Sequence, residues 1–130
     1  MRKAVLHLGV VAAYALLMTL VSLMPGNVSE PWFPHIDKLL HLAAYAAFAV
    51  LCAPIWWQSE NVQRTALITL MLLCLFGGAM ELAQTLVPNR EASWLDMLAN
   101  SLGLVLGWGA SLGIKKARIW RAFVDKKKSV

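Results

Sequence analysis

Apolar residues form four long runs along the chain, separated by short segments that contain charged or turn-forming residues. The runs extend over about residues 4–24, 36–57, 65–87 and 94–114. Each approaches the ~20 residues that an α-helix needs to cross ~30 Å of hydrocarbon. Pro25-Gly26 follows the first run and Pro88 follows the third, and proline disfavours continuation of a helix. The pattern predicts an all-α polytopic membrane protein, a bundle of four transmembrane helices forming one domain over residues 1–130.

Composition agrees with a membrane protein and excludes a soluble or disordered one. The chain has 130 residues, of which 59% are hydrophobic and 15% charged, and its mean hydropathy is +0.62. A soluble domain of this size has too much surface for its volume to hide so many apolar side chains. Cys52 and Cys74 lie in apolar runs without a CxxC partner, so we expect small buried hydrophobes. The first run is too long for a secretory signal and lacks a small-x-small cleavage site, so we expect it to stay uncleaved.

Basic residues concentrate on one side of the predicted membrane. Two of the twelve, Lys38 and Arg90, belong to one side. The other ten belong to the opposite side: Arg2, Lys3, Arg64, Lys115, Lys116, Arg118, Arg121, Lys126, Lys127 and Lys128. Cytoplasmic segments carry an excess of Lys and Arg, so both termini are predicted to be cytoplasmic and segments 25–36 and 88–94 to face outward. This bias explains the net charge of +5, and no nucleic-acid partner is predicted.

The basic tail, residues 115–130, follows the last apolar run. Trp120 and Phe123 are interleaved with its cations. Basic segments with aromatic residues bind anionic membrane surfaces, so an interfacial helix on the inner leaflet is expected. Docking of a partner protein on this tail is the alternative.

Small residues recur at every fourth position of the fourth run, at Ala99, Gly103 and Gly107. Such a stripe lets a neighbouring helix backbone approach closely. Gly77 and Gly78 of the third run are its expected counterparts. We expect the stripe to serve packing within one bundle rather than association of two chains.

Polar residues inside the apolar runs gather at one depth. A charged group in hydrocarbon costs several kcal/mol, so such residues are rarely placed there without a partner or a task. Helical spacing and a rise of about 1.5 Å per residue bring them to one level below the outer surface. They come from three helices and one loop: Asp37, Lys38, His41, Tyr45, Glu81, Gln84, Arg90, Asp96 and Asn100.

Three interpretations of this polar set stay open. In the first, Arg90, His41 and Lys38 bind a lipid phosphate while a carboxylate acts as base or orients the imidazole. In the second, a divalent metal binds Asp37, His41, Glu81 and Asp96; no fixed motif such as HExxH supports it, and no metal or cofactor is predicted. In the third, the groups satisfy one another and only lock the bundle. Glu81 favours a site, because it lies neither at a helix start nor at the predicted surface.

The ordered polar motifs resemble the VanZ-like membrane proteins. They read Asp37-Lys38-x-x-His41-x-x-x-Tyr45, then Glu81-x-x-Gln84, then Pro88-x-Arg90-x-x-Ser93-x-x-Asp96-x-x-x-Asn100-x-x-Gly103-x-x-x-Gly107. The resemblance covers roughly residues 35–110. It implies a small multi-pass protein of a bacterial cytoplasmic membrane, in a family whose namesake is associated with low-level resistance to the glycopeptide teicoplanin. It implies no cofactor.

The leading hypothesis is a site that binds or modifies the head group of an envelope lipid, such as a polyprenyl phosphate, a glycolipid or a lipid-linked cell-wall precursor. Arg90 and Lys38 would hold the head group, and His41 and Glu81 would carry any proton chemistry. The residues expected to orient them or line the site are Asp37, Asp96, Gln84, Asn100 and Tyr45. The alternative is a non-catalytic accessory or scaffold protein that binds partners through its helix faces and basic tail. An ion carrier is disfavoured, because it would need polar residues across the whole membrane.

Overall fold

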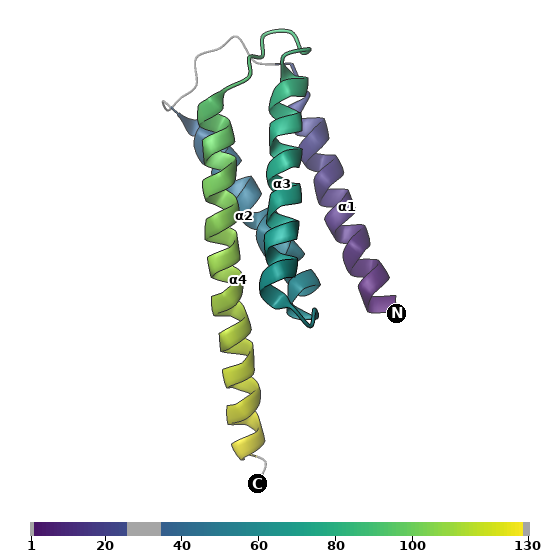
Figure 1. Cartoon of the computed structure of the whole chain (residues 1–130), viewed down its shortest axis with the longest axis vertical. Coiled ribbons are helices and arrows are strands. Elements are labelled where there is room, and N and C mark those ends of the chain that lie inside the picture. Colours follow the sequence, from purple (N-terminus) through teal and green to yellow (C-terminus); the bar gives the residue numbers. More distant parts are fainter. Residues whose placement is uncertain (1, 26–34, 129–130) are drawn as a thin grey trace.

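The computed structural model describes residues 2–25 and 35–128, and within these ranges the fold is built from four helices and contains no strand. The helices are α1 (Arg2–Ser22), α2 (Ile36–Trp57), α3 (Val62–Gln84) and α4 (Trp94–Lys128). They run alternately up and down, so both ends of the chain lie at the same end of the bundle (Figure 1). We call the opposite end, where α1 and α3 end and α2 and α4 begin, the far end. Most of the predicted outward segment 25–36 lies outside the described residues.

Each helix is long and apolar enough to cross a membrane, as the sequence predicts. Large apolar side chains are exposed along all four, among them Leu16 on α1, Leu40 on α2, Leu75 on α3 and Leu106 on α4. A surface of this kind is stable in lipid but not in water. The chain is therefore a multi-pass membrane protein.

Helix α2 lies at the centre of the bundle and packs most extensively against α4. Gly103 and Gly107 make this close approach possible. A Cβ atom at Gly103 would overlap the carbonyl oxygen of Leu42, and one at Gly107 would overlap that of Ala46. The small-residue stripe of α4 thus faces α2, and the expected pairing with Gly77 and Gly78 of α3 is wrong.

Aromatic rings join α1 and α3 to the same central helix. Phe48 of α2 makes edge-to-face contacts with Tyr14 of α1 and Phe76 of α3, at centroid distances of 5.3 and 5.9 Å. Cys52 is buried next to this core and Cys74 is partly buried, and both are free thiols. The cysteines are therefore small hydrophobes, as predicted.

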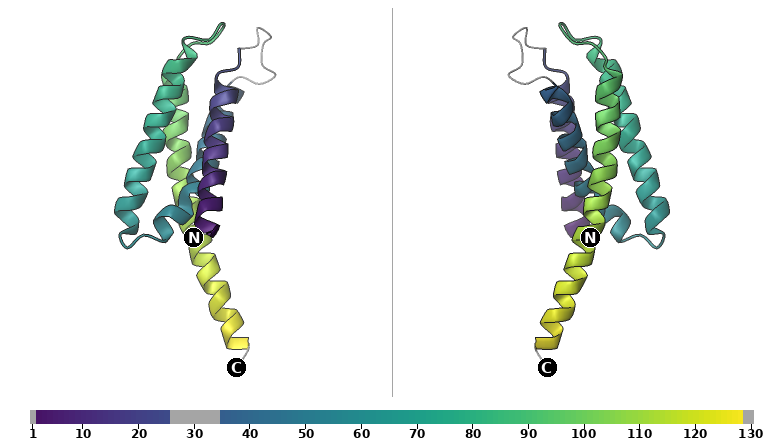
Figure 2. Two further views of the ribbon diagram at one scale, coloured as in Figure 1. Left: turned by 90° about the vertical axis from the view of Figure 1, so that its right-hand side faces the viewer. Right: turned by 90° about the vertical axis from the view of Figure 1, so that its left-hand side faces the viewer.

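Helix α4 continues without a break through the basic segment. The apolar run predicts an end near Ile114, yet the helix extends to Lys128 and projects beyond the other three helices (Figure 2). Lys, Arg and Ala are good helix formers and no proline interrupts the segment, so the change from apolar to basic residues does not end the helix. We call residues 115–128 the basic extension.

Candidate functional site

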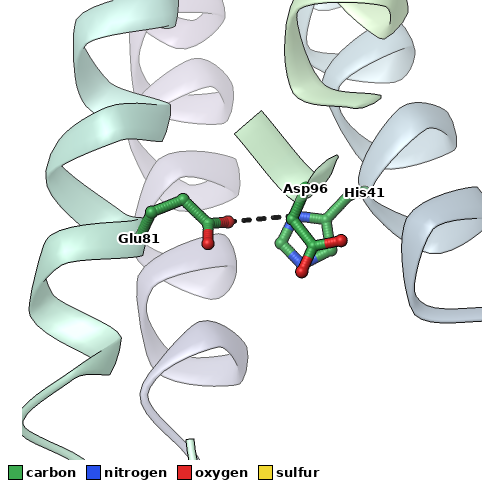
Figure 3. A group of neighbouring side chains, drawn as sticks. All are labelled: His41, Glu81 and Asp96. Atoms are coloured by element: carbon green, nitrogen blue, oxygen red, sulfur yellow. Dashed lines mark ion pairs between the residues drawn. The ribbon is translucent and has the colours of Figure 1, made fainter. Parts of the chain in front are cut away.

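Three polar side chains from three helices meet at the far end of the bundle. One imidazole nitrogen of His41 (α2), one carboxylate oxygen of Glu81 (α3) and one of Asp96 (α4) lie within 4.8 Å of one another. The side chains point toward a common centre between the helices (Figure 3). We call these three residues the three-helix cluster.

His41 connects the cluster to Asn100. Its Nδ1 atom lies 2.9 Å from Oδ1 of Asn100 and 3.7 Å from Oε1 of Glu81, the contact drawn in Figure 3. Asn100 lies one turn after Asp96 on α4, and its side chain is buried. Its Nδ2 has no hydrogen-bond partner among the described residues. A donor that could bind a ligand is thus present beside the imidazole.

Glu81 is a buried carboxylate that is only half satisfied. The residue is 4% exposed, and its Oε2 accepts a hydrogen bond of 3.2 Å from the backbone N–H of Ser93. Its Oε1 has no hydrogen-bond partner within the described part of the chain. An unmet buried acceptor costs the full desolvation of the group, about 1–3 kcal/mol and more when it is charged. The Oε1 atom thus faces His41 with an unused capacity to accept a hydrogen bond or to bind a cation.

Asp96 is held by a lysine from α2. Lys38 Nζ lies 3.0 Å from Asp96 Oδ1 and 2.7 Å from Asp37 Oδ2. The Asp37 side chain is 53% exposed, whereas that of Asp96 is 11% exposed. The hydroxyl of Ser93 accepts a weak hydrogen bond of 3.4 Å from the backbone N–H of Asp96 at the start of α4. One ammonium thus serves two carboxylates at the rim of the cluster.

Three other residues predicted for the site make their contacts elsewhere. Arg90 donates from Nε to the carbonyl oxygen of Met24 at 3.2 Å, and Gln84 donates to that of Ser22 at 3.2 Å. Gln84 therefore connects the last turn of α3 to the end of α1, and Arg90 connects the segment between α3 and α4 to Met24, just after α1. Tyr45 is buried against Gly77 and against the ring of Phe48, one helical turn below His41.

An apolar groove of about 200 Å³ lies between α1 and α2 and reaches His41. We call it the lateral groove. Its lining is mostly aliphatic or aromatic: Tyr14, Leu17, Met18, Val21, Ser22, Leu40, His41, Ala44 and Tyr45. Tyr14 also donates a hydrogen bond of 3.0 Å to the carbonyl of Ala44, which fixes one wall. A single residue, His41, thus belongs to both the groove and the cluster.

Sequence reasoning did not find the roles of Ser93 and Tyr14. The Ser93-x-x-Asp96 spacing is typical of a helix N-cap, and this signal could have predicted that the Ser93 hydroxyl accepts from the backbone N–H of Asp96. It does not predict that the Ser93 N–H donates to Glu81. Tyr14 carried no such signal, because a tyrosine in an apolar run equally suits the core.

The arrangement offers two kinds of chemistry. Carboxylate and imidazole groups on facing helices can bind a cation, or they can exchange protons with a bound molecule. The buried Asn100 amide and the free Glu81 oxygen can also form hydrogen bonds with a polar head group.

Comparison with known proteins gives a family match. The model of the family described as VanZ/LLP1 matches residues 5–115, a range that overlaps all four membrane-spanning segments and contains every residue of the cluster. No curated protein and no solved structure matches the chain significantly.

Proposed function

Because the chain belongs to the VanZ/LLP1 family, as its motifs predict, we propose that it binds the head group of an envelope lipid at the three-helix cluster. The observation that carries this proposal is the position of His41, which lines an apolar groove between α1 and α2 and also belongs to the buried polar cluster. A lipid has the same division into an apolar chain and a polar head. The apolar chain of the lipid would lie in the lateral groove, and its head group would bind at the three-helix cluster.

The two unpartnered atoms favour a head group rich in hydroxyls. Asn100 Nδ2 offers a hydrogen-bond donor, and Glu81 Oε1 offers an acceptor. A sugar hydroxyl both donates and accepts, so one ring could satisfy both atoms. A phosphate alone would satisfy only the donor, and it would meet two buried carboxylates. A glycolipid or a lipid-linked cell-wall precursor therefore fits best, and this class of ligand would connect the chain to teicoplanin resistance.

The positive-inside bias supports a location of the cluster in the outer leaflet of a bacterial cytoplasmic membrane, with both termini cytoplasmic. Thiol labelling of intact cells tests this orientation. A membrane-impermeant reagent should label Glu91→Cys, at the far end, in intact cells. It should label Asp125→Cys, in the basic extension, only after lysis. The reverse pattern would exclude the proposed topology.

Mass spectrometry of lipids that co-purify in mild detergent tests the ligand. Met18→Trp fills the lateral groove, while Leu72→Trp adds the same ring on the exposed face of α3 as a matched control. We expect one sugar-bearing lipid class to be enriched with the wild type and the control, and lost with Met18→Trp and Glu81→Gln. Equal lipid profiles for all four folded proteins would refute lipid binding at this site.

A second candidate function, docking of a partner protein, rests on the basic extension. Its projection beyond the bundle makes Trp120 and Phe123 accessible, with 65% and 61% of their surface exposed. The small-residue stripe does not support this function, because α2 already covers it. Replacing Lys115, Lys116 and Arg121 by Gln should disturb a docking protein, and it should leave co-purified lipid unchanged if the cluster is the functional site.

A further inference from the structure

The three-helix cluster contains the side-chain types that bind divalent transition metals. An imidazole and two carboxylates are ligands shared by Zn²⁺, Mn²⁺ and Fe²⁺, whereas Mg²⁺ and Ca²⁺ bind mainly oxygen. We infer that His41, Glu81 and Asp96 form the binding site for one divalent transition-metal ion.

Distances at the cluster agree with this inference. Bonds of about 2.1 Å in a tetrahedral site place neighbouring ligand atoms about 3.4 Å apart. His41 Nδ1 and Glu81 Oε1 are 3.7 Å apart, and all three ligand atoms lie within 4.8 Å of one another. Rotation of the Asp96 and Glu81 side chains could bring their oxygens to bonding distance without movement of a helix. Binding of the ion through His41 Nδ1 would replace the hydrogen bond that this nitrogen makes with Asn100 Oδ1.

Glu81 supplies an independent sign of a missing partner. Its carboxylate is 4% exposed, and the oxygen that points at His41 has no hydrogen-bond partner in the described ranges (Figure 3). Its other oxygen is fixed by the Ser93 N–H, which keeps the free oxygen directed into the cluster. A bound cation would satisfy this oxygen, as metal ligands in proteins are held by second contacts of this kind.

The charge of the surroundings also favours a cation. Asp37, Glu81 and Asp96 are three carboxylates, and Lys38 is the one cationic side chain within 4.0 Å of them among the described lysines and arginines. With a neutral imidazole the group carries a formal charge of about −2, which one divalent ion would neutralise. Arg90 forms no ion pair within 4.0 Å with these three carboxylates among the described residues, and its Nε donates to the carbonyl of Met24 instead.

The ion would connect the three helices that carry its ligands, and it would also offer a binding position to the head group of the proposed lipid. Three protein ligands leave at least one coordination position open, to which a hydroxyl or phosphate oxygen of a head group can bind. This role in head-group binding rests on the proposed function, whereas binding of the ion itself does not require any lipid.

Zn²⁺ titration of the full chain tests the inference. Protein purified in detergent and treated with EDTA is titrated with Zn²⁺ by isothermal calorimetry. We expect one Zn²⁺ per chain, with affinity reduced at least tenfold in Glu81→Gln and Asp96→Asn. The control, His7→Gln, should stay within about twofold of the wild type, because His7 lies outside the cluster and outside the group of charges around it. No saturable binding by the wild type, or equal affinity in all the variants, would overturn the inference.

X-ray absorption of the Zn²⁺-loaded wild type identifies the ligand atoms without the use of variants. We expect one imidazole and otherwise oxygen ligands around the ion. A shell with sulfur, with no imidazole or with two imidazoles would overturn the site.

Lipid analysis of metal-free and Zn²⁺-loaded protein separates the two proposals. If Zn²⁺ binds and no lipid is enriched, the lipid proposal fails and the metal site stands. If a lipid is enriched and Zn²⁺ does not bind, the metal site fails alone.

Discussion

Adding one methyl group at the α2–α4 contact should destabilise the protein measurably. A Cβ atom at Gly107 would overlap the backbone carbonyl of Ala46, and one at Gly103 would overlap that of Leu42. Backbone atoms cannot rotate away, so the two helices would have to separate by about 1 Å to restore normal contact. Overpacking of this kind costs about 1–3 kcal/mol.

Gly109 provides a matched control on the same helix. A Cβ atom there meets nothing within 4 Å. Glycine to alanine in a helix gains up to about 1 kcal/mol of propensity, and this gain is common to all three positions. The difference between Gly107→Ala and Gly109→Ala therefore isolates the steric term, and we expect it to lower the free energy of unfolding by about 1–3 kcal/mol.

Equilibrium unfolding in detergent, followed by circular dichroism, measures this difference. Gly103→Ala and Gly107→Ala should unfold at lower denaturant than Gly109→Ala, which should match or exceed the wild type. Because α2 and α4 carry His41 and Asp96, the two destabilised variants should also lower the affinity of the cluster for a ligand. Equal stability of the three variants would refute the close-contact argument.

Three further substitutions test other contacts, each by the same unfolding assay. Arg90→Ala removes the surface hydrogen bond to Met24, so it should cost less than about 1 kcal/mol and leave lipid binding intact; loss of the lipid would return Arg90 to the site. Lys38→Met leaves Asp96 without its cation, so it should destabilise by about 1–3 kcal/mol, and an unchanged midpoint would contradict the ion pair. Tyr14→Phe removes one hydrogen bond and should cost about 0.5–1.5 kcal/mol, and an unchanged midpoint would contradict a stabilising role of this bond.

The sequence predicts the helices and the meeting of the three polar residues because both depend on periodicity and depth. The expected bounds of α2, Ile36 to Trp57, agree with the structure. Counting residues from the helix ends places His41, Glu81 and Asp96 at a similar level, and the structure brings them together. The end of α4 was missed, because hydrophobicity marks where a helix leaves the membrane and not where it stops.

Other features could not be predicted because they depend on which helices are neighbours. The hydrogen bond of Arg90 to Met24 forms where α1 ends beside the connection between α3 and α4. Periodicity within one helix does not contain this information. The partner of Gly103 and Gly107 is unspecified for the same reason, since a small-residue stripe accepts any backbone of suitable shape.

Helix α4 is a single continuous helix that connects the cluster at the far end to the basic extension at the opposite end of the bundle. Asp96 and Arg121 lie 25 positions apart on one helix, about 38 Å along its axis. Between these two positions, at Gly103 and Gly107, the helix touches the backbone of α2, and a tilt of α4 would have this contact as its pivot. A tilt of about 5° would displace the two positions relative to each other by roughly 3 Å across the axis. Such a tilt would move the basic extension and the Asp96 carboxylate in opposite directions.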